Sequence, residues 1–467
     1  MVSLNQNVRI MFSKETYIAR RTQLKKTIGS GLLLFLGNEE CGVNYADNTY
    51  PFRQDSTFLY YFGLSYAGLS AVIDIDNNKE IIFGDELTID SIVWMGQQPT
   101  LSEKCERVGI THMLPSNATE IYLKDAIQKG QKIHYLPPYR PEHQLKLFAW
   151  TGEHPAVQQA SLPFIMAVIN QRNYKSDEEV AEIEKACIVT ADMHLTAMRT
   201  VRPGILESEV AAAVAEVALA ANYQLSFPII ATINGQTLHN HHHGNKIKSG
   251  DLFLLDAGAE TEMGYAGDMT STIPADATYT TRQKEIYDIV IASHEASIKE
   301  LRPGVTFESV YDTSAKVIVE GLKSLGFMRG DAAEAVKAGA HALFYPHGLG
   351  HMMGLDVHDM ENLGEIYVGH NGQPKSTQFG RKSLRLGRML EPGFVHTIEP
   401  GIYFIPELID LWRSERKFEE FINYEKVVTY KDFGGIRNEA DYLITPTGSR
   451  LLGKQLPRTT EEIEALR

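Results

Sequence analysis

Cysteine is scarce in this chain: its 467 residues include only Cys41, Cys105 and Cys187. An odd and sparse count argues against a disulfide framework and is typical of proteins in a reducing compartment. None of the three stands beside a residue suited to act as its base. We therefore expect all three cysteines to be structural and the protein to be cytoplasmic.

Long apolar runs and basic runs are missing as well. The largest apolar run near the start, GLLLFLG at residues 31–37, is too short to cross a membrane and predicts a buried strand. The first residues carry no apolar signal-peptide core. The net charge is −14, and no basic run suggests nucleic acid. We expect neither a membrane nor a nucleic-acid partner.

The pattern of predicted strands and helices changes near residue 170. Before it, short apolar strands alternate with helical stretches, and SAVIDID followed by KEIIFGD predicts a hairpin closed by Asp-Asn-Asn. After it, Ser176 and Glu179 form a capping box that begins a long helix. We expect two domains, residues 1–170 and 171–467.

The second domain contains an internal repeat. VRPGILESEV begins at Val201 and LRPGVTFESV at Leu301, and each predicts the end of one helix and the start of another. GDLFLLD and GFVHTIE both place a carboxylate, Asp256 or Glu399, six residues after a glycine. A second acid follows in each half: Asp268 and Glu439. Two related halves predict a pseudo-twofold fold with its acids converging at the axis.

Three histidines fall in HGLGHMMGLDVHD, at His347, His351 and His358. A helix fits this stretch poorly because each of its glycines costs about 1 kcal/mol relative to alanine. We expect a glycine-rich turn that delivers His351 and enters a short strand, MGLDVHD. On such a strand Asp356 and His358 share one face.

Together, Asp256, Asp268, Glu399, Glu439 and His351 predict a metal site. One acid in an apolar strand can end the strand or pair with arginine, whereas four acids and a histidine call for a cation. Carboxylates with one imidazole suit Mn²⁺. Four negative charges suffice for two divalent ions about 3.5–4 Å apart, which can share a water and lower its pKa. The predicted chemistry is hydrolysis without a covalent enzyme intermediate.

Four blocks resemble the signatures of the pita-bread metallopeptidases, in the branch of aminopeptidase P and prolidase: LLDAGAETEMGYAGDMT, PHGLGHMMGLDVHD, TIEPGIYF and GGIRNEADYLIT. The resemblance covers roughly residues 175–455, and FRQDSTFLYYFGL resembles the creatinase-like first domain of that branch. It implies an α+β fold: a pseudo-twofold pita-bread catalytic domain preceded by a smaller, creatinase-like α/β domain.

The resemblance also implies roles for the site residues. Asp256, Asp268, His351, Glu399 and Glu439 would hold two divalent ions, with Asp268 and Glu439 bridging or chelating and Glu399 also handling the proton of the water. His358 would stabilise the tetrahedral intermediate or pass a proton. His347 would orient the metal ligands without binding the metal itself. Asp256 and Asp268 are twelve residues apart, where the family usually has eleven. We expect a bulge or a longer hairpin tip near ETEMG.

Four further residues are candidates for contact with substrate. His239, in LHNHHHGN, stands where the family places a substrate-contacting histidine, while His241, His242 and His243 fit a solvated loop. Arg437 lies two residues before Glu439, which predicts that both share one strand face; it could form an ordinary salt bridge, but we expect it to orient the metal-binding acids. Arg385 is a surface charge or, as the resemblance to prolidases implies, a clamp for the carboxylate of a dipeptide. Trp94 belongs to the core or, as the resemblance implies, closes the active site of a neighbouring subunit.

The resemblance implies an Xaa-Pro aminopeptidase, which releases an amino-terminal residue ahead of proline, working as a homo-oligomer, a dimer or a tetramer. The alternative is an Xaa-Pro dipeptidase, or prolidase, restricted to dipeptides. A metal-free pita-bread binding module is disfavoured because the full ligand set is present, and a creatinase-like amidinohydrolase is disfavoured for the same reason. A methionine aminopeptidase would usually lack the first domain.

Overall fold

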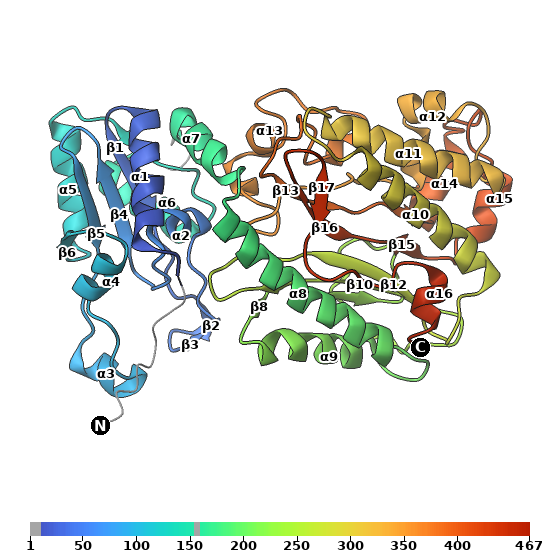
Figure 1. Ribbon diagram of the computed structural model, residues 1–467, viewed down its shortest axis with the longest axis horizontal. Coiled ribbons are helices and arrows are strands. Elements are labelled where there is room, and N and C mark those ends of the chain that lie inside the picture. Colours follow the sequence, from blue (N-terminus) through green and yellow to red (C-terminus); the bar gives the residue numbers. More distant parts are fainter. Residues whose placement is uncertain (1–10, 154–158) are drawn as a thin grey trace. The chain divides into compact units, whose positions relative to one another are not determined.

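The computed structural model describes residues 11–153 and 159–467. The chain forms two compact units (Figure 1). The first contains the residues up to Arg172 together with Met360–Gly364, and the second contains Asn173–Asp359 and Glu365–Arg467. The segment Met360–Gly364, which lies within the expected second domain, thus groups with the first unit.

The first unit is built on a five-stranded sheet in the order β6-β5-β4-β1-β7. Its strands are β1 (Leu32–Leu36), β4 (Ser70–Asp74), β5 (Lys79–Phe83), β6 (His112–Leu114) and β7 (Ile133–His134). Strands β4 and β5 pair antiparallel as the expected hairpin. The small hairpin of β2 (Gly42–Tyr45) and β3 (Asn48–Thr49) stands apart from this sheet.

Helices pack on both faces of that sheet, which makes the unit α/β. The helices of the unit are α1 (Lys14–Ile28), α2 (Ser56–Phe62), α3 (Ile89–Met95), α4 (Leu101–Arg107), α5 (Ala118–Gln128), α6 (Pro141–Thr151) and α7 (Leu162–Arg172), and among them α3 buries none of its residues. Because neighbouring residues of a strand point to opposite faces, Leu34 packs with Leu123 of α5 and Leu147 of α6. The ring of Phe35 contacts Phe62 and Phe164 instead.

The second unit pairs long helices with short antiparallel sheets. Its helices are α8 (Asp177–Thr200), α9 (Glu207–Ala220), α10 (Thr281–Glu300), α11 (Phe307–Ser324), α12 (Ala332–Ala338), α13 (Glu365–Val368), α14 (Pro406–Ser414), α15 (Tyr424–Val427) and α16 (Thr460–Glu464). Its strands are β8 (Gln224–Leu225), β9 (Ile230–Thr232), β10 (Leu252–Ala257), β11 (Ala259–Glu260), β12 (Met269–Pro274), β13 (Val395–Ile398), β14 (Gly401–Tyr403), β15 (Gly435–Arg437), β16 (Ala440–Ile444) and β17 (Ser449–Leu451).

Two halves of the second unit repeat the same plan, as the sequence repeat predicts. In the first half α8 and α9 pair and β10 runs antiparallel to β12; in the second, α10 and α11 pair and β13 runs antiparallel to β16. The Ser176–Glu179 capping box begins α8. The α+β, pseudo-twofold fold is therefore confirmed. It places the two acid-bearing strand pairs in the middle of the unit.

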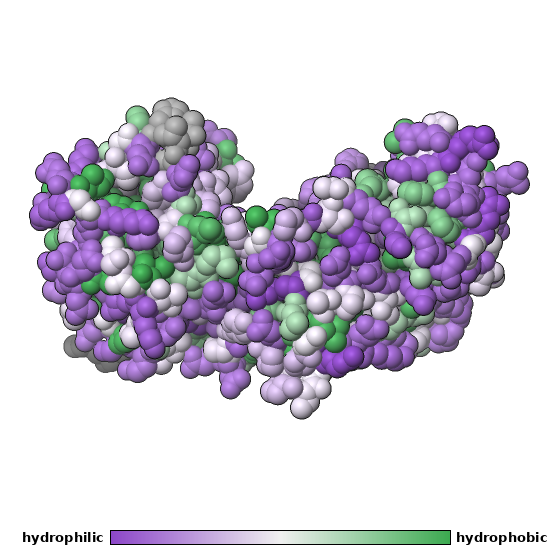
Figure 2. All heavy atoms as spheres, turned by 90° about the horizontal axis from the view of Figure 1, so that it is seen from above, coloured by the Kyte–Doolittle hydropathy of each residue, from purple (hydrophilic) through white to green (hydrophobic). Residues whose placement is uncertain are grey.

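The surface bears on the expectations drawn from composition. The face seen in Figure 2 is mostly hydrophilic, with apolar side chains in small patches. Within the described residues no helix is long and apolar enough to span a membrane. Cys105 and Cys187 are buried, as structural cysteines would be, whereas Cys41 is exposed, so packing gives it no structural role.

Candidate metal centre and active site

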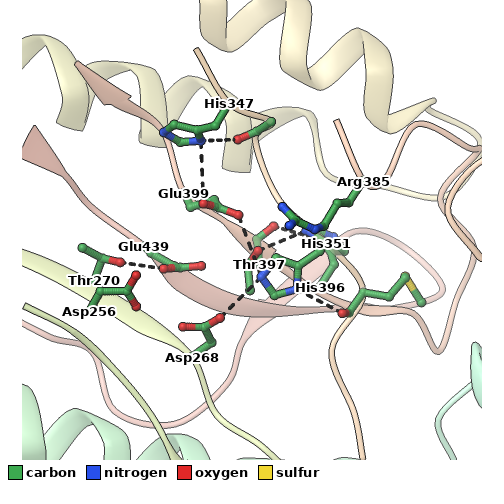
Figure 3. Close-up of polar contacts among 12 residues, drawn as sticks. Asp256, Asp268, Thr270, His347, His351, Arg385, His396, Thr397, Glu399 and Glu439 are labelled. Carbon is green, nitrogen blue, oxygen red and sulfur yellow. Dashed lines mark hydrogen bonds and ion pairs between the residues drawn. The ribbon is translucent and has the colours of Figure 1, made fainter. Parts of the chain in front are cut away.

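Four acids stand at the ends of the central strands. Asp256 lies in β10, Asp268 directly before β12, Glu399 directly after β13, and Glu439 directly before β16. An antiparallel bridge between Thr270 and Glu439 joins the two halves. Across it the Glu439 N–H donates to the Thr270 carbonyl at 3.0 Å, and the Thr270 hydroxyl donates to Glu439 Oε2 at 2.7 Å. The pseudo-twofold plan thus brings acids from both halves to one place (Figure 3).

His351 reaches the acids from a glycine-rich turn. Its N–H donates to the Thr397 hydroxyl at 3.2 Å, and the Thr397 N–H donates to its carbonyl at 3.0 Å. A Cβ at Gly350 would come within 2.2 Å of the Thr397 carbonyl, so this approach requires glycine. His351 Nε2 lies 3.4 Å from Asp268 Oδ2 and 3.8 Å from Glu399 Oε1.

The protonation pattern of His351 suits a ligand. Its Nδ1 lies 3.1 Å from the Met352 carbonyl, which places the ring proton there and leaves the Nε2 lone pair facing the acids. Burial, together with the neighbouring His358, holds the pKa of His351 well below its ordinary value. The imidazole is therefore neutral, as metal binding requires.

The buried acids repel one another, and a bound cation would relieve this repulsion. Asp268, His351 and Glu439 offer ligand atoms that all lie within 4.8 Å of one another. Burial and mutual repulsion raise the pKa of Asp268 and of Glu439 well above the ordinary value, and burial raises the pKa of Glu399 to about 7. Among the described residues, the buried Asp256 Oδ1 and Asp268 Oδ1 have no hydrogen-bond partner. These residues fit a divalent cation.

A second network lies beside this cluster. Arg437 donates to Asp256 Oδ2 at 2.5 Å, to the Thr270 hydroxyl at 3.1 Å and to the Tyr403 hydroxyl at 2.9 Å. The Tyr403 oxygen lies 2.8 Å from His347 Nε2, and His347 Nδ1 lies 3.8 Å from Glu399 Oε2. Arg437 thus contacts one acid directly, in keeping with the expected orienting role. The expected shared strand is interrupted, because β15 ends at Arg437 and β16 begins after Glu439.

A cavity of about 230 Å³ opens onto the acids. The four acids and His351 line it, and so do His239, His347, His358, Arg385 and Arg437. Its apolar wall comes from Phe227, Pro228, Ile230, Leu238 and Val357. His241 also lines the cavity, and it is exposed like His242, as expected of a solvated loop. The fold therefore gathers nearly every residue singled out from the sequence around one space.

The stretch after His351 is a compact loop, so the expectation of a strand over MGLDVHD is wrong. The Asp359 N–H donates back to the Met352 carbonyl at 2.9 Å, and the Gly354 N–H donates to the Asp356 carbonyl at 3.1 Å. The loop sets the His358 ring against that of His351, with centroids 4.2 Å apart. Met352 forms an isolated bridge to His396, and beyond it the backbone bonds within the loop take the place of a ladder.

A buried ion pair fixes this loop. Lys175 Nζ lies 2.9 Å from Asp359 Oδ2, and both side chains are 1% exposed. Lys175 stands directly before the N-cap of α8, and its N–H donates to the Gly393 carbonyl. The loop that carries His351 and His358 is thereby tied to the start of the first helix of this unit.

We expect Lys175→Met to lower the free energy of unfolding of the second unit by about 3–5 kcal/mol, because it leaves the Asp359 charge buried without its cation. Chemical denaturation followed by a probe in that unit measures the change. Lys185→Met is the matched control, since its pair with Glu182 is 55% exposed on the lysine side and contributes at most about 1 kcal/mol. Equal effects of the two substitutions would contradict a holding role for the buried pair.

Two further expectations concern the spacing of Asp256 and Asp268 and the environment of Trp94. The segment between Asp256 and Asp268 turns in a hairpin tip at ETEMG, where the Thr261 N–H donates to the Tyr265 carbonyl and Gly264 has a positive φ of 87°. Trp94 lies in the first unit on α3, is 86% exposed and is therefore no core residue.

Sequence reasoning missed Tyr403 and Thr270, which connect the acids to Arg437 and His347. Thr270 lies two residues after Asp268, so the period of a strand would have placed both on one face. Tyr403 follows Glu399 by four residues across a turn, and no local periodicity marks it. Lys175 was also missed, because nothing in its neighbourhood indicates burial.

Comparison with known proteins agrees with this geometry. The family model described as metallopeptidase family M24 matches residues 181–446, and the model described as the aminopeptidase P N-terminal domain matches residues 17–135. An Xaa-Pro aminopeptidase of Escherichia coli strain K12 is 31% identical, over 97% of this chain and 98% of its own. An Xaa-Pro dipeptidase of Homo sapiens is 29% identical, over 96% of this chain and 91% of its own.

Solved structures show the same likeness. Proline aminopeptidase P II from Yersinia pestis superposes with a TM-score of 0.81 at 27% identity, covering 97% of this chain and 99% of its own. The match extends over both units, so the relationship is not confined to the catalytic half. The chain belongs to metallopeptidase family M24, and its first unit is an N-terminal domain of the aminopeptidase P type.

Proposed function

We propose that this chain is a dinuclear, Mn²⁺-dependent Xaa-Pro aminopeptidase of the cytoplasm. The observation that carries the proposal is the set of four acids and a neutral histidine around one cavity. Relatives named as Xaa-Pro aminopeptidase and Xaa-Pro dipeptidase over nearly the whole chain support the reaction class.

The five residues expected from the sequence would hold two divalent ions: Asp256, Asp268, His351, Glu399 and Glu439. The unpartnered oxygens of Asp256 and Asp268 and the free Nε2 of His351 support this assignment. An oxygen-rich donor set with one imidazole favours Mn²⁺. When bound, such ions lower the pKa of a water and polarise the carbonyl of the scissile bond.

The remaining polar groups bind and orient. His358 and His239 line the cavity and contact the substrate, with His358 placed to stabilise charge on the carbonyl oxygen. Glu399 takes the proton of the attacking water, and His347 lies beside it. Arg437 orients Asp256 directly, and it orients Glu439 through the hydroxyl of Thr270.

Proline in the second position poses a specific problem, because an Xaa-Pro bond is a tertiary amide without an N–H. A general peptidase that binds this N–H loses a contact, so a dedicated site is needed. The apolar wall near Phe227 and Leu238 offers a surface for a ring without a donor. The acids supply the negative charge that the free amino terminus of the peptide requires.

The dipeptidase alternative depends on Arg385, which lines the cavity. Its side chain is 32% exposed, and its Nε lies 3.7 Å from Glu365 Oε1. An arginine that is partly solvated and already near a protein carboxylate does not need the terminal carboxylate of a dipeptide to balance it. This environment favours the aminopeptidase, which accepts longer peptides.

We expect Ala-Pro and Ala-Pro-Ala to be hydrolysed with kcat/KM values within about tenfold of each other, both releasing free alanine. Arg385→Ala should change the two values alike, and Lys382→Ala, an exposed neighbour, should change neither. A preference for Ala-Pro above about a hundredfold, near 2.7 kcal/mol, that Arg385→Ala removes would identify the enzyme as a dipeptidase.

The enzyme acts as a homo-oligomer, a dimer or a tetramer, in which Trp94 closes a neighbouring active site. The exposure of Trp94 together with Ile89, Val93 and Met95 on the same helix supports a surface that another subunit covers. Light scattering of the purified protein measures the assembly.

A further inference from the structure

Glu207 is a buried carboxylate that the metal site does not use. It stands at the first residue of α9 and is fully buried. Its Oε1 accepts from the Thr232 hydroxyl at 3.1 Å and from the Ile233 N–H at 2.8 Å. Its Oε2 accepts from the N–H and the side-chain amide of Asn245, at 3.0 and 2.9 Å. Four donors converge on one acid, which offsets its loss of hydration.

The repeat shows that the helix start itself does not need this acid. Aligning VRPGILESEV with LRPGVTFESV puts Phe307 opposite Glu207, and both residues begin their helices. Phe307 is buried and packs on His396, with ring centroids 5.0 Å apart. One half of the fold therefore fills the position with an apolar ring. In the other half, the role of the Glu207 carboxylate therefore lies in the groups that it binds.

What Glu207 binds is one loop, residues 233–245, at both of its ends. Ile233 begins the loop and Asn245 ends it. Backbone bonds run beside the carboxylate: the Glu207 N–H donates to the Asn245 carbonyl, and the Ser208 N–H donates to the His243 carbonyl. The loop is thus closed on the first turn of α9.

The same network reaches the middle of the loop. The Thr232 hydroxyl, which donates to Glu207, accepts from the Asn234 N–H at 2.9 Å and from the Asn240 side-chain amide at 3.0 Å. Asn240 Oδ1 in turn accepts from the His242 N–H at 3.1 Å. Asn240 stands between His239 and His241, the two loop histidines that line the cavity.

We infer that Glu207 is a positioning residue for substrate recognition: through Thr232 and Asn240 it sets where His239 and His241 stand on the cavity wall. The part of this inference that concerns substrate rests on the proposed function. A carboxylate is required because both of its oxygens accept, whereas a glutamine would turn an N–H₂ toward N–H donors.

The test compares Glu207→Gln with Glu209→Gln. Glu209 lies on the same turn and is exposed, and it accepts from the Leu206 N–H at 2.7 Å without touching the loop. Amide hydrogen exchange of the metal-loaded protein, read by mass spectrometry, should speed up about tenfold over residues 233–245 in Glu207→Gln only. Unchanged exchange there, or equal change in the control, would overturn the inference.

Kinetics adds a readout that general loosening would not give. With metal content unchanged, kcat/KM for Ala-Pro-Ala should fall at least about tenfold in Glu207→Gln. In the double variant with His239→Ala, the two losses should fall clearly short of adding, because Glu207 acts in part through the side chain of His239. Asn240→Ala, which leaves the buried carboxylate in place, should reproduce the kinetic loss if Glu207→Gln does not fold.

Different results would contradict the proposed function and the positioning role of Glu207. If the wild-type protein hydrolyses no proline peptide, the proposed function fails, and the exchange measurement still decides whether Glu207 holds the loop. If the wild-type protein is active and the losses in Glu207→Gln and His239→Ala simply add, the positioning role is overturned.

Discussion

Removing metal with a chelator is expected to reduce hydrolysis of Ala-Pro-Ala by at least about a thousandfold, the equivalent of about 4 kcal/mol, and Mn²⁺ should restore it. The reason is the composition of the cavity. Asp268, Glu399 and Glu439 have raised pKa values when no cation balances them. Without a cation, no Lewis acid lowers the pKa of the water that Glu399 deprotonates.

The thermal stability of the protein should also depend on bound metal. Binding to the folded state alone stabilises it by about 2.7 kcal/mol at a hundred times the dissociation constant, so Mn²⁺ should raise the Tm of the metal-free protein. Mg²⁺ and Zn²⁺ at equal concentration serve as comparisons for the choice of ion. Full activity in protein shown to be metal-free by elemental analysis would refute the metal site.

His358→Ala is expected to keep its metal content and to lose about 10²–10³ in kcat, the range for removing one group that stabilises developing negative charge. The His358 ring lies beside that of His351 and lines the cavity. In the described part of the chain, the imidazole whose ligand atom converges with those of Asp268 and Glu439 is that of His351.

His351→Ala is the matched variant, because it removes the neighbouring imidazole of the same loop and should lose metal as well as activity. Elemental analysis of both proteins separates the two roles. Loss of metal in His358→Ala with retention in His351→Ala would mean that the two histidines have exchanged roles.

The features that were predictable from the sequence are those with local causes. The capping box at Ser176, the Arg-Pro-Gly boundaries and the glycine-to-acid spacing before Asp256 and Glu399 are short-range patterns, and the structure contains the helices and strands they predict. A repeated pattern implies repeated structure, so the meeting of the two halves also followed. The acids were identified because charge in an apolar strand is costly.

Features with non-local causes were not predictable in the same way. The MGLDVHD stretch looks like a strand, but its backbone bonds to itself and its Asp359 pairs with Lys175, more than 180 residues earlier in the chain. Tyr403 joins Arg437 to His347 only because β14 pairs with β15. Such contacts depend on tertiary packing, which periodicity does not encode.

The measurement that tests the central claim most directly compares two peptides on the Mn²⁺-loaded protein, Ala-Pro-Ala and Ala-Ala-Ala, by release of free amino-terminal alanine. The account predicts hydrolysis of the proline peptide with a kcat/KM at least about a hundredfold higher, a difference near 2.7 kcal/mol. Equal hydrolysis of both peptides, or hydrolysis of neither, would contradict it.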